Sequence, residues 1–177
     1  MPDVAIRPAV LADLPALTDI YNHYILNTTI TFDLAPFEPD ERRGWFDDHS
    51  AAGRHRLLVA TDAADGGTVV GYASTSRWRP KAAYETTVES SVYCRADAVG
   101  RGIGTRLYEA LFESIDGEDV HRIVAGVSLP NPASVALHER LGFQRVGVFE
   151  KVGRKFGRYW DVAWYERRFQ NHRGEEA

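Results

Sequence analysis

The sequence has one cysteine and no long run of apolar residues. A single cysteine, Cys94, excludes an internal disulfide framework and a zinc site built from several cysteines. The chain has no apolar run of about 20 residues, the length that a membrane-spanning helix needs. Residues 1–10 also lack the basic and apolar regions of a secretory signal. We therefore expect a cytoplasmic protein that does not bind a membrane.

The chain also lacks an excess of positive charge. It carries 21 Lys and Arg against 25 Asp and Glu, a net charge of −4, and shows no basic stripe, so nucleic acid is not an expected partner. Its histidines show no metal-ligand spacing such as H-x-x-x-H, and we expect no metal site. A length of 177 residues with 44% hydrophobic residues indicates one ordered domain. We place this domain at residues 1–170 and expect the polar tail, 171–177, to be disordered.

Hydrophobic spacing predicts an alternation of strands and helices. Hairpins and two strand–helix–strand crossovers occur together, which indicates an α/β fold with a central, twisted, mixed sheet flanked by helices. We expect strands at 4–7, 57–61, 69–77, 86–94, 123–127, 143–152 and 159–169, and helices at 13–28, 40–52, 103–115 and 131–141.

The most informative segment is the glycine loop at residues 100–104 (GRGIG), between an expected strand and an expected helix. Glycines let the backbone turn tightly and bring N–H groups close to an anion. A helix start adds unpaired N–H groups and the positive end of its dipole. Arg101 and Arg106 add positive side chains. The segment predicts a pyrophosphate cradle, and an ordinary turn before a helix is the alternative.

Two common nucleotide-binding motifs do not fit this loop. A Walker loop requires Gly-Lys-Ser/Thr, whereas Gly104 is followed by Thr105 and Arg106. The dinucleotide motif G-x-G-x-x-G requires its third glycine at the position that Thr105 occupies. A different phosphate-bearing ligand is therefore indicated.

The loop, the order of elements and the run at 131–143 (NPASVALHERLGF) resemble the GNAT superfamily of acetyltransferases. Within it, the likeness is to phosphinothricin and methionine sulfoximine N-acetyltransferases, and it spans roughly residues 6–169. It includes Tyr21-Asn22, Thr31-Phe32, Trp78-Arg79, Thr87-Val88-Glu89, Val92-Tyr93 and Lys155-Phe156-Gly157-Arg158 with Asp161. The resemblance implies a GNAT-like acyl-CoA N-acyltransferase fold, acetyl-CoA as co-substrate, a small-molecule amine as acceptor and a homodimer.

The resemblance also implies a set of residues that bind the co-substrate. The backbone of Val92, Tyr93 and Cys94 would pair with the pantetheine arm like an added strand, and Asn131 would bond the arm from the other side. The pyrophosphate would be held by Arg101, Gly102, Ile103, Gly104, Thr105 and Arg106, and Val99 and Gly100 before them are also expected to bind the co-substrate. The sequence departs from the superfamily at Val99, where Gln or Arg is frequent. Because backbone N–H groups hold most of the pyrophosphate, we expect binding to survive this change.

Acetyl transfer to an amine requires a base for the ammonium proton, donors for the developing oxyanion and a proton for the leaving thiolate. Glu89 is the candidate base, because a carboxylate in a partly apolar cleft has its pKa raised toward a useful range. A solvated strand carboxylate is the alternative. His138 stands where many GNAT enzymes have a tyrosine. It is a candidate for protonating the thiolate or assisting Glu89, and a structural histidine is the alternative.

Arg79 is the candidate anchor for a substrate carboxylate, since arginine binds carboxylates bidentately. A loop arginine in solvent is the alternative. The other substrate-binding candidates are Phe32, Arg77, Trp78, Tyr84, Thr87 and Val88. The resemblance implies amino-acid analogues such as phosphinothricin, methionine sulfoximine or methionine sulfone as substrates. Two further functions stay open: a protein N-terminal acetyltransferase and a non-catalytic CoA-binding sensor.

Overall fold

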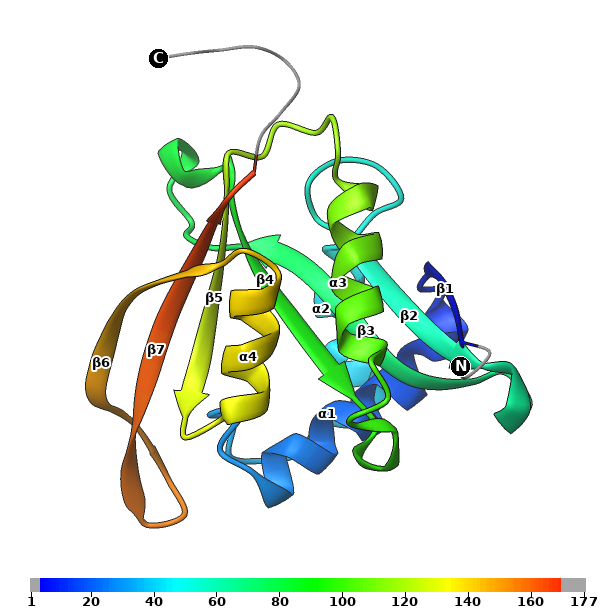
Figure 1. Cartoon of the computed structure of the whole chain (residues 1–177). Helices are drawn as coiled ribbons and strands as arrows, with labels where there is room; N and C mark the ends of the chain where they lie inside the picture. The colour runs from blue at the N-terminus through cyan, green and yellow to red at the C-terminus, as the bar shows by residue number, and fades with distance from the viewer. Residues whose placement is uncertain (1–3, 170–177) are drawn as a thin grey trace.

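The computed structural model describes residues 4–169 and contains one seven-stranded sheet in the order β1-β2-β3-β4-β5-β7-β6 (Figure 1). The strands are β1 (Val4–Pro8), β2 (Leu57–Asp62), β3 (Thr68–Arg77), β4 (Thr87–Cys94), β5 (Arg122–Leu129), β6 (Gln144–Lys155) and β7 (Arg158–Arg168). The helices are α1 (Leu14–Asn27), α2 (Arg43–Asp47), α3 (Ile103–Ser114) and α4 (Pro132–Arg140). The predicted fold class is confirmed, and the tail at 171–177 lies outside the described residues.

The sheet is mixed, as predicted, because β4 and β5 are parallel while the other neighbouring strands are antiparallel. Helix α3 makes the crossover from β4 to β5. Helix α4 leads from β5 to β6, but β7 lies between these two strands. The second predicted crossover therefore exists without joining adjacent strands.

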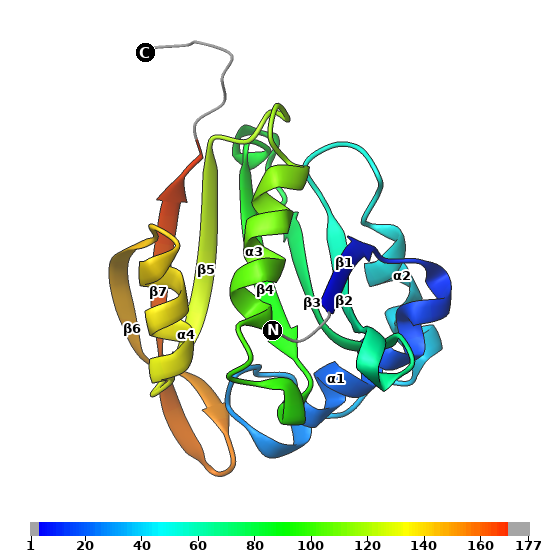
Figure 2. The same ribbon diagram turned by 45° about the vertical axis from the view of Figure 1, so that its right-hand side comes forward.

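Two layers of helices cover the sheet. Helices α3 and α4 lie on one face and α1 and α2 on the other (Figure 2). Successive strand residues point to opposite faces, so Leu58 packs in the core under α3 while Val59 packs against Leu17 and Ile20 of α1. Every one of these four side chains is at most 6% exposed. Burial on both faces fixes the register of the central strands.

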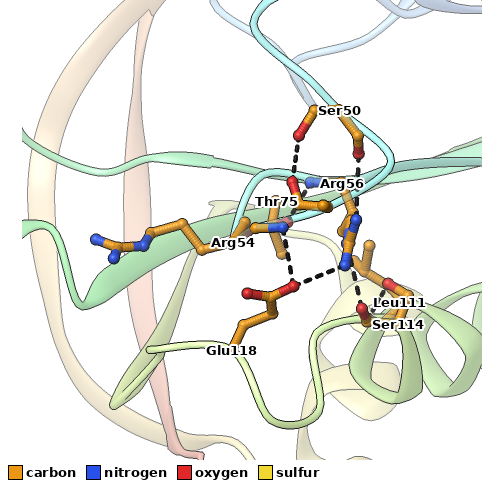
Figure 3. Close-up of polar contacts among 9 residues, drawn as sticks. Ser50, Arg54, Arg56, Thr75, Leu111, Ser114 and Glu118 are labelled. Carbon is orange, nitrogen blue, oxygen red and sulfur yellow. Dashed lines mark hydrogen bonds and ion pairs between the residues drawn. The ribbon is translucent and has the colours of Figure 1, made fainter.

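The second predicted helix, at 40–52, is shorter in the structure. A 3-10 turn at Pro39–Arg42 leads into α2, which ends at Asp47. Polar contacts hold the loop that follows (Figure 3): the Glu118 carboxylate accepts from the Gly53 N–H at 2.8 Å and from Arg56 Nη2 at 2.9 Å. These long-range bonds replace the helical bonds that the hydrophobic pattern suggested.

Hydrogen bonds of Arg56 also connect this loop to α3 and β3. Arg56 Nε donates to the Ser114 carbonyl at 3.2 Å, and the Arg56 N–H donates to Thr75 Oγ1 at 2.9 Å. Thr75 Oγ1 in turn donates to the Arg54 carbonyl at 2.8 Å. The carboxyl end of α3 is thereby fastened to the sheet, which holds its amino end beside the open part of the sheet.

That opening lies between β4 and β5. The two strands pair only from Thr87 to Glu89 with Arg122 to Val124. Beyond these residues β4 continues to Cys94 and β5 to Leu129, and the strands diverge (Figure 1). The sheet therefore forks at Glu89.

Candidate active site

The free edge of β4 forms one wall of the cleft in the fork. From Ser90 to Cys94, β4 pairs with β3 on one side, and no strand among residues 4–169 pairs with its other side. Its backbone N–H and C=O groups on that side can bind an extended ligand in the manner of a strand. This geometry fits the predicted role of Val92, Tyr93 and Cys94 toward a pantetheine arm.

The glycine loop leads from the end of β4 into α3. Gly102 is the N-cap of α3 with φ +76°, and Gly100 has φ +82°, a region that glycine adopts without strain. No side chain caps the helix. The N–H groups of its first turn therefore remain available for an anion. A groove of about 440 Å³ runs along this loop between α3 and α4, and these features fit the diphosphate and arm of CoA.

The two arginines expected to add charge to this cradle point elsewhere. Arg101 forms an ion pair with Asp62, which is 3% exposed, and Arg106 Nη2 donates to the Val4 carbonyl at 2.6 Å. A buried carboxylate requires a charged partner, so Arg101 neutralises Asp62 at the end of β2. Neither the Arg101 nor the Arg106 side chain lines the groove. Arg140 of α4 lines it instead. Sequence reasoning missed Arg140, and its place in the last turn of the helix within the run at 131–143 was the only signal.

Asn131 lies where the cleft and the groove meet, and it lines both. It is the N-cap of α4, and its Oδ1 accepts from the Ser134 N–H at 3.1 Å. Asparagine at this position and Pro132 after it are favourable for starting a helix. The Nδ2 group is not used by the cap, so it can donate to a ligand in the cleft.

Glu89 is half-buried at the apex of the fork, directly opposite Ser76 of β3. Burial raises the pKa of the Glu89 carboxyl, and the positive charge of Arg79 opposes this rise. The Arg79 guanidinium lies 5.1 Å from the centre of the Trp78 ring, which meets the Tyr84 ring edge-on. The structure thus brings four predicted residues together beside the fork.

Other predicted substrate residues lie apart from this group. Val88 is fully buried and faces the α3 side, so only its main chain is near the cleft. Arg77 and Thr87 line a separate hollow with His55. Phe32 packs on the backbone of Gly153 in β6, where a Cβ atom would collide with its ring.

His138 lies inside the cleft and is 3% exposed. Its Nδ1 is 2.8 Å from the Ser134 carbonyl and its Nε2 is 3.2 Å from the Tyr108 hydroxyl. Burial lowers the pKa of His138 and so favours the neutral ring. A proton on Nδ1 satisfies the carbonyl, and Nε2 then accepts from Tyr108.

Tyr108 is a site residue that sequence reasoning missed. Its position on α3 indicated only a place on the buried face of that helix. In the structure its hydroxyl lies 3.4 Å from Ser90 Oγ and lines the cleft with His138. Nothing in its sequence spacing distinguishes it from the apolar residues of the same helix face.

Neither a metal site nor a membrane span is found in residues 4–169. No group of three or more His, Cys, Asp or Glu side chains in this range could hold a metal ion. No helix in it is long and apolar enough to cross a bilayer.

The model of the acetyltransferase (GNAT) family matches residues 17–143. The chain belongs to this family. It is an acetyl-CoA-dependent N-acetyltransferase, and the predicted fold and co-substrate are confirmed. The fork, the uncapped start of α3 and the free edge of β4 are the parts of this acetyltransferase that suit a CoA thioester.

This acetyltransferase is similar along most of its length to characterised and solved proteins. It is 54% identical to the phosphinothricin N-acetyltransferase of Streptomyces coelicolor, over 93% of this chain and 96% of the relative. It is 43% identical to the L-methionine sulfoximine/L-methionine sulfone acetyltransferase of Pseudomonas aeruginosa, over 92% of both chains. A GNAT phosphinothricin acetyltransferase of Sinorhizobium meliloti in complex with acetyl-CoA superposes with a TM-score of 0.88 at 31% identity, over 98% of this chain and 93% of that chain. An acetyltransferase of Salmonella typhimurium with acetyl-CoA gives 0.90 at 34% identity, over 99% of both.

Proposed function

We propose that the acetyl acceptor is the amino group of a small amino-acid analogue of the phosphinothricin, methionine sulfoximine or methionine sulfone type. The observation that carries this proposal is the position of the half-buried Glu89 at the fork, within reach of the positive charge of Arg79. Burial raises the pKa of the Glu89 carboxyl at the apex of the fork, and the positive charge of Arg79 acts on it. A free amino acid brings an ammonium and a carboxylate on one carbon, and these charges complement the pair. The names of the similar enzymes support the same class of substrate.

When bound, acetyl-CoA supplies the acetyl group. The N–H groups around Gly102 bind its diphosphate, and the edge of β4 with Asn131 aligns its arm along the cleft. Arg79 holds the carboxylate of the acceptor, and Trp78 and Tyr84 exclude water beside it. Glu89 takes the proton of the ammonium, directly or through a water, because only the free amine attacks. The half-buried carboxylate is suited to this step, since its raised pKa makes it a stronger base.

Tyr108 and His138 are positioned to supply the proton that the thiolate leaving group requires. The Tyr108 hydroxyl lies in the cleft, and His138 Nε2 lies behind it. A thiolate leaving group requires a proton donor, and its thiol has an ordinary pKa of about 8.5. We propose that the Tyr108 hydroxyl would deliver this proton to the thiolate and regain one from solvent, while the neutral ring of His138 positions the hydroxyl through Nε2.

The test is a substrate screen with acetyl-CoA on the original protein and Glu89→Gln. We expect Glu89→Gln to lower kcat by about 10²- to 10⁴-fold while its dissociation constant for acetyl-CoA is unchanged. Glu109→Gln, an exposed change on α3, is the matched control and should behave like the original protein. Unreduced activity of Glu89→Gln would disprove the assignment of the base.

The same screen separates the two alternative functions. Activity on peptide N-termini without turnover of any amino acid would favour a protein N-terminal acetyltransferase. Binding of acetyl-CoA without turnover of any amine would favour a CoA-binding sensor. Arg79→Ala should raise the KM for amino acids and leave the affinity for acetyl-CoA unchanged.

We also propose a cytoplasmic homodimer whose partner molecules are small amines rather than nucleic acid or a membrane. Strand β6 is an edge strand that exposes a row of apolar side chains: Val146, Val148, Phe149 and Val152 are 38–65% exposed. Such an edge favours pairing with a second copy. The single cysteine, the net charge of −4 and the use of acetyl-CoA support the location and the partners. Light scattering of Phe149→Asp should show a monomer if the proposal is right.

A further inference from the structure

A second hollow adjoins Glu89 on the α1 side of the sheet. It has a volume of about 240 Å³ and is lined by Tyr21, Arg42, Trp45, Tyr72, Ser76 and Ser91, among others. Ser76 lies opposite Glu89, and Ser91 is two residues further along β4 on the same face. The strand residues that line the hollow run from Ser76, opposite Glu89, to Tyr72, opposite Tyr93, which is about 13 Å between Cα atoms along β3.

Arg42 forms a buried positive wall of this hollow. Arg42 is 6% exposed. Its guanidinium lies 4.5 Å from the centre of the Tyr21 ring and 4.0 Å from the centre of the Trp45 ring. Within residues 4–169, its one hydrogen bond runs from Nη1 to the Leu17 carbonyl at 3.1 Å, and no carboxylate forms an ion pair with it. A guanidinium has five N–H donors, and a buried charge without a counter-charge is costly.

Tyr72 adds an unused hydroxyl to the same wall. The residue is 1% exposed, and its hydroxyl has no hydrogen-bond partner in the described part of the chain. Burial raises the pKa of Tyr72, and the nearby charge of Arg42 opposes the rise. The phenol thus stays protonated and able to donate. A buried polar group without a partner is rare and destabilising. Even if the Tyr72 oxygen accepts from Arg42, the hydroxyl proton and the other guanidinium N–H groups can donate to a ligand in the hollow.

The acidic side chains around the hollow do not fill this need. Asp33 and Glu41 also line it, and both are exposed. Asp33 accepts from the Tyr21 hydroxyl at 2.6 Å, and Glu41 accepts from the Glu38 N–H at 2.7 Å. They form a rim in contact with solvent, where salt screens their charge. The inner wall therefore has no carboxylate and combines the Arg42 guanidinium with the hydroxyls of Tyr72, Ser74, Ser76 and Ser91.

We propose that Arg42 and Tyr72 bind the oxygen atoms at the end of the substrate side chain, which belongs to an amino acid with an oxidised sulfur or phosphorus. This inference rests on the proposed function, because it requires an amino-acid substrate with its ammonium at Glu89. Four bonds separate such an amine from the sulfur or phosphorus, and they span roughly 5 Å. The strand run from Glu89 to the level of Tyr72 is longer than this, so the side chains of Glu89 and Tyr72 must bridge the difference.

Tyr72→Phe tests this subsite without disturbing the fold, since the lost hydroxyl has no internal partner. We would measure kcat/KM for methionine sulfone and for methionine, which lacks the oxygens. The ratio of the two values should fall by about five- to tenfold in Tyr72→Phe. Tyr24→Phe is the matched control, because its hydroxyl donates to the Cys94 carbonyl at 2.6 Å. This control should lower the Tm and leave the ratio unchanged.

Arg42→Met keeps an apolar side chain between the two rings and removes the donors. We expect a lower Tm, from loss of the Leu17 bond, together with a fall in the sulfone-to-methionine ratio of about tenfold or more. The ratio compares two substrates on the same folded molecules, so partial unfolding cancels. A lower Tm with an unchanged ratio would show that Arg42 only supports the rings.

The outcomes also separate this inference from the proposed function. An original protein that acetylates no amino acid overturns both. An original protein that acetylates amino acids overturns the subsite alone in either of two cases: it does not prefer methionine sulfone to methionine, or Tyr72→Phe and Arg42→Met both retain its preference.

Discussion

Glu89 faces Val124 at the last position where β4 and β5 pair. The carboxylate therefore lies where the sheet opens, between the covered core and the cleft. On one side of it the paired strands exclude water, and on the other side the free edge of β4 begins. This position explains how one strand provides both a base of raised pKa and a binding edge for the co-substrate.

Glu89→Gln should make the protein more stable at neutral pH. Because burial raises the pKa of Glu89 in the folded state, ionisation above the ordinary glutamate pKa of about 4.3 favours the unfolded chain. Glutamine does not ionise and removes this cost. We expect a gain of about 0.5–2 kcal/mol in the free energy of unfolding at pH 7.5. Urea melts at pH 7.5 and pH 4 should show the gain shrinking at the lower pH, and an equal gain at both would contradict the buried-charge explanation.

Gly102→Ala should weaken acetyl-CoA binding through the backbone. Gly102 has φ +76°, and an alanine there costs about 1–2 kcal/mol. Gly117→Ala is the matched control, since Gly117 has φ +81°, equally open surroundings and a position beyond the far end of α3. Both variants should lose similar stability in urea melts. Calorimetry should show weaker acetyl-CoA binding only for Gly102→Ala, and equal binding would mean that the loop N–H groups do not hold the ligand.

The sequence pattern predicts this fold well because most of its elements carry their own local signals. Asn131 before Pro132 marks a helix start, and glycines at 100 and 102 mark a turn that needs positive φ. The length of α2 was mispredicted because contacts from Arg56 and Glu118, distant in sequence, decide where the chain leaves the helix.

The site is less predictable than the fold. Motif likeness named Glu89 as the base and Arg79 as the anchor, and in the structure the charge of Arg79 is near enough to lower the raised pKa of Glu89. The motif likeness assigned Arg101 to the phosphates. In the structure Arg101 forms an ion pair with buried Asp62, and this contact between residues 39 positions apart cannot be read from the local sequence. The convergence of Arg42 and Tyr72 likewise has no local pattern, because the 3-10 turn at Pro39–Arg42 and β3 meet only through packing.

Gly153→Ala should reduce stability and substrate affinity together. A Cβ at this position of β6 would collide with the Phe32 ring. The neighbouring Lys155 Nζ donates to the Thr31 carbonyl at 2.8 Å, and Thr31 Oγ1 contacts the Tyr21 hydroxyl at 2.7 Å. Moving the ring therefore disturbs the segment that borders the hollow beside Glu89. We expect a loss of about 1–3 kcal/mol in the free energy of unfolding and a higher KM for the amine.

Gly147→Ala is the control for that change, because nothing lies within 4 Å of a Cβ there. It should alter stability by less than about 0.5 kcal/mol. A thermal melt and an amine titration of both variants complete the comparison. If the two variants behave alike, the contact between β6 and Phe32 does not support the pocket.

Stability should fall as the pH drops from 7 to 5 because of buried histidines. Burial lowers the pKa of both His49 and His138 in the folded state. The unfolded chain takes up protons near the ordinary histidine pKa of about 6.5, before the folded state does. The neutral rings therefore contribute stability above that pKa, and this contribution is lost as the pH falls, by at most about 1.4 kcal/mol per pH unit for each group. Urea melts of His138→Gln should show a shallower decline over this range, whereas a slope equal to that of the original protein would mean that His138 titrates alike in both states.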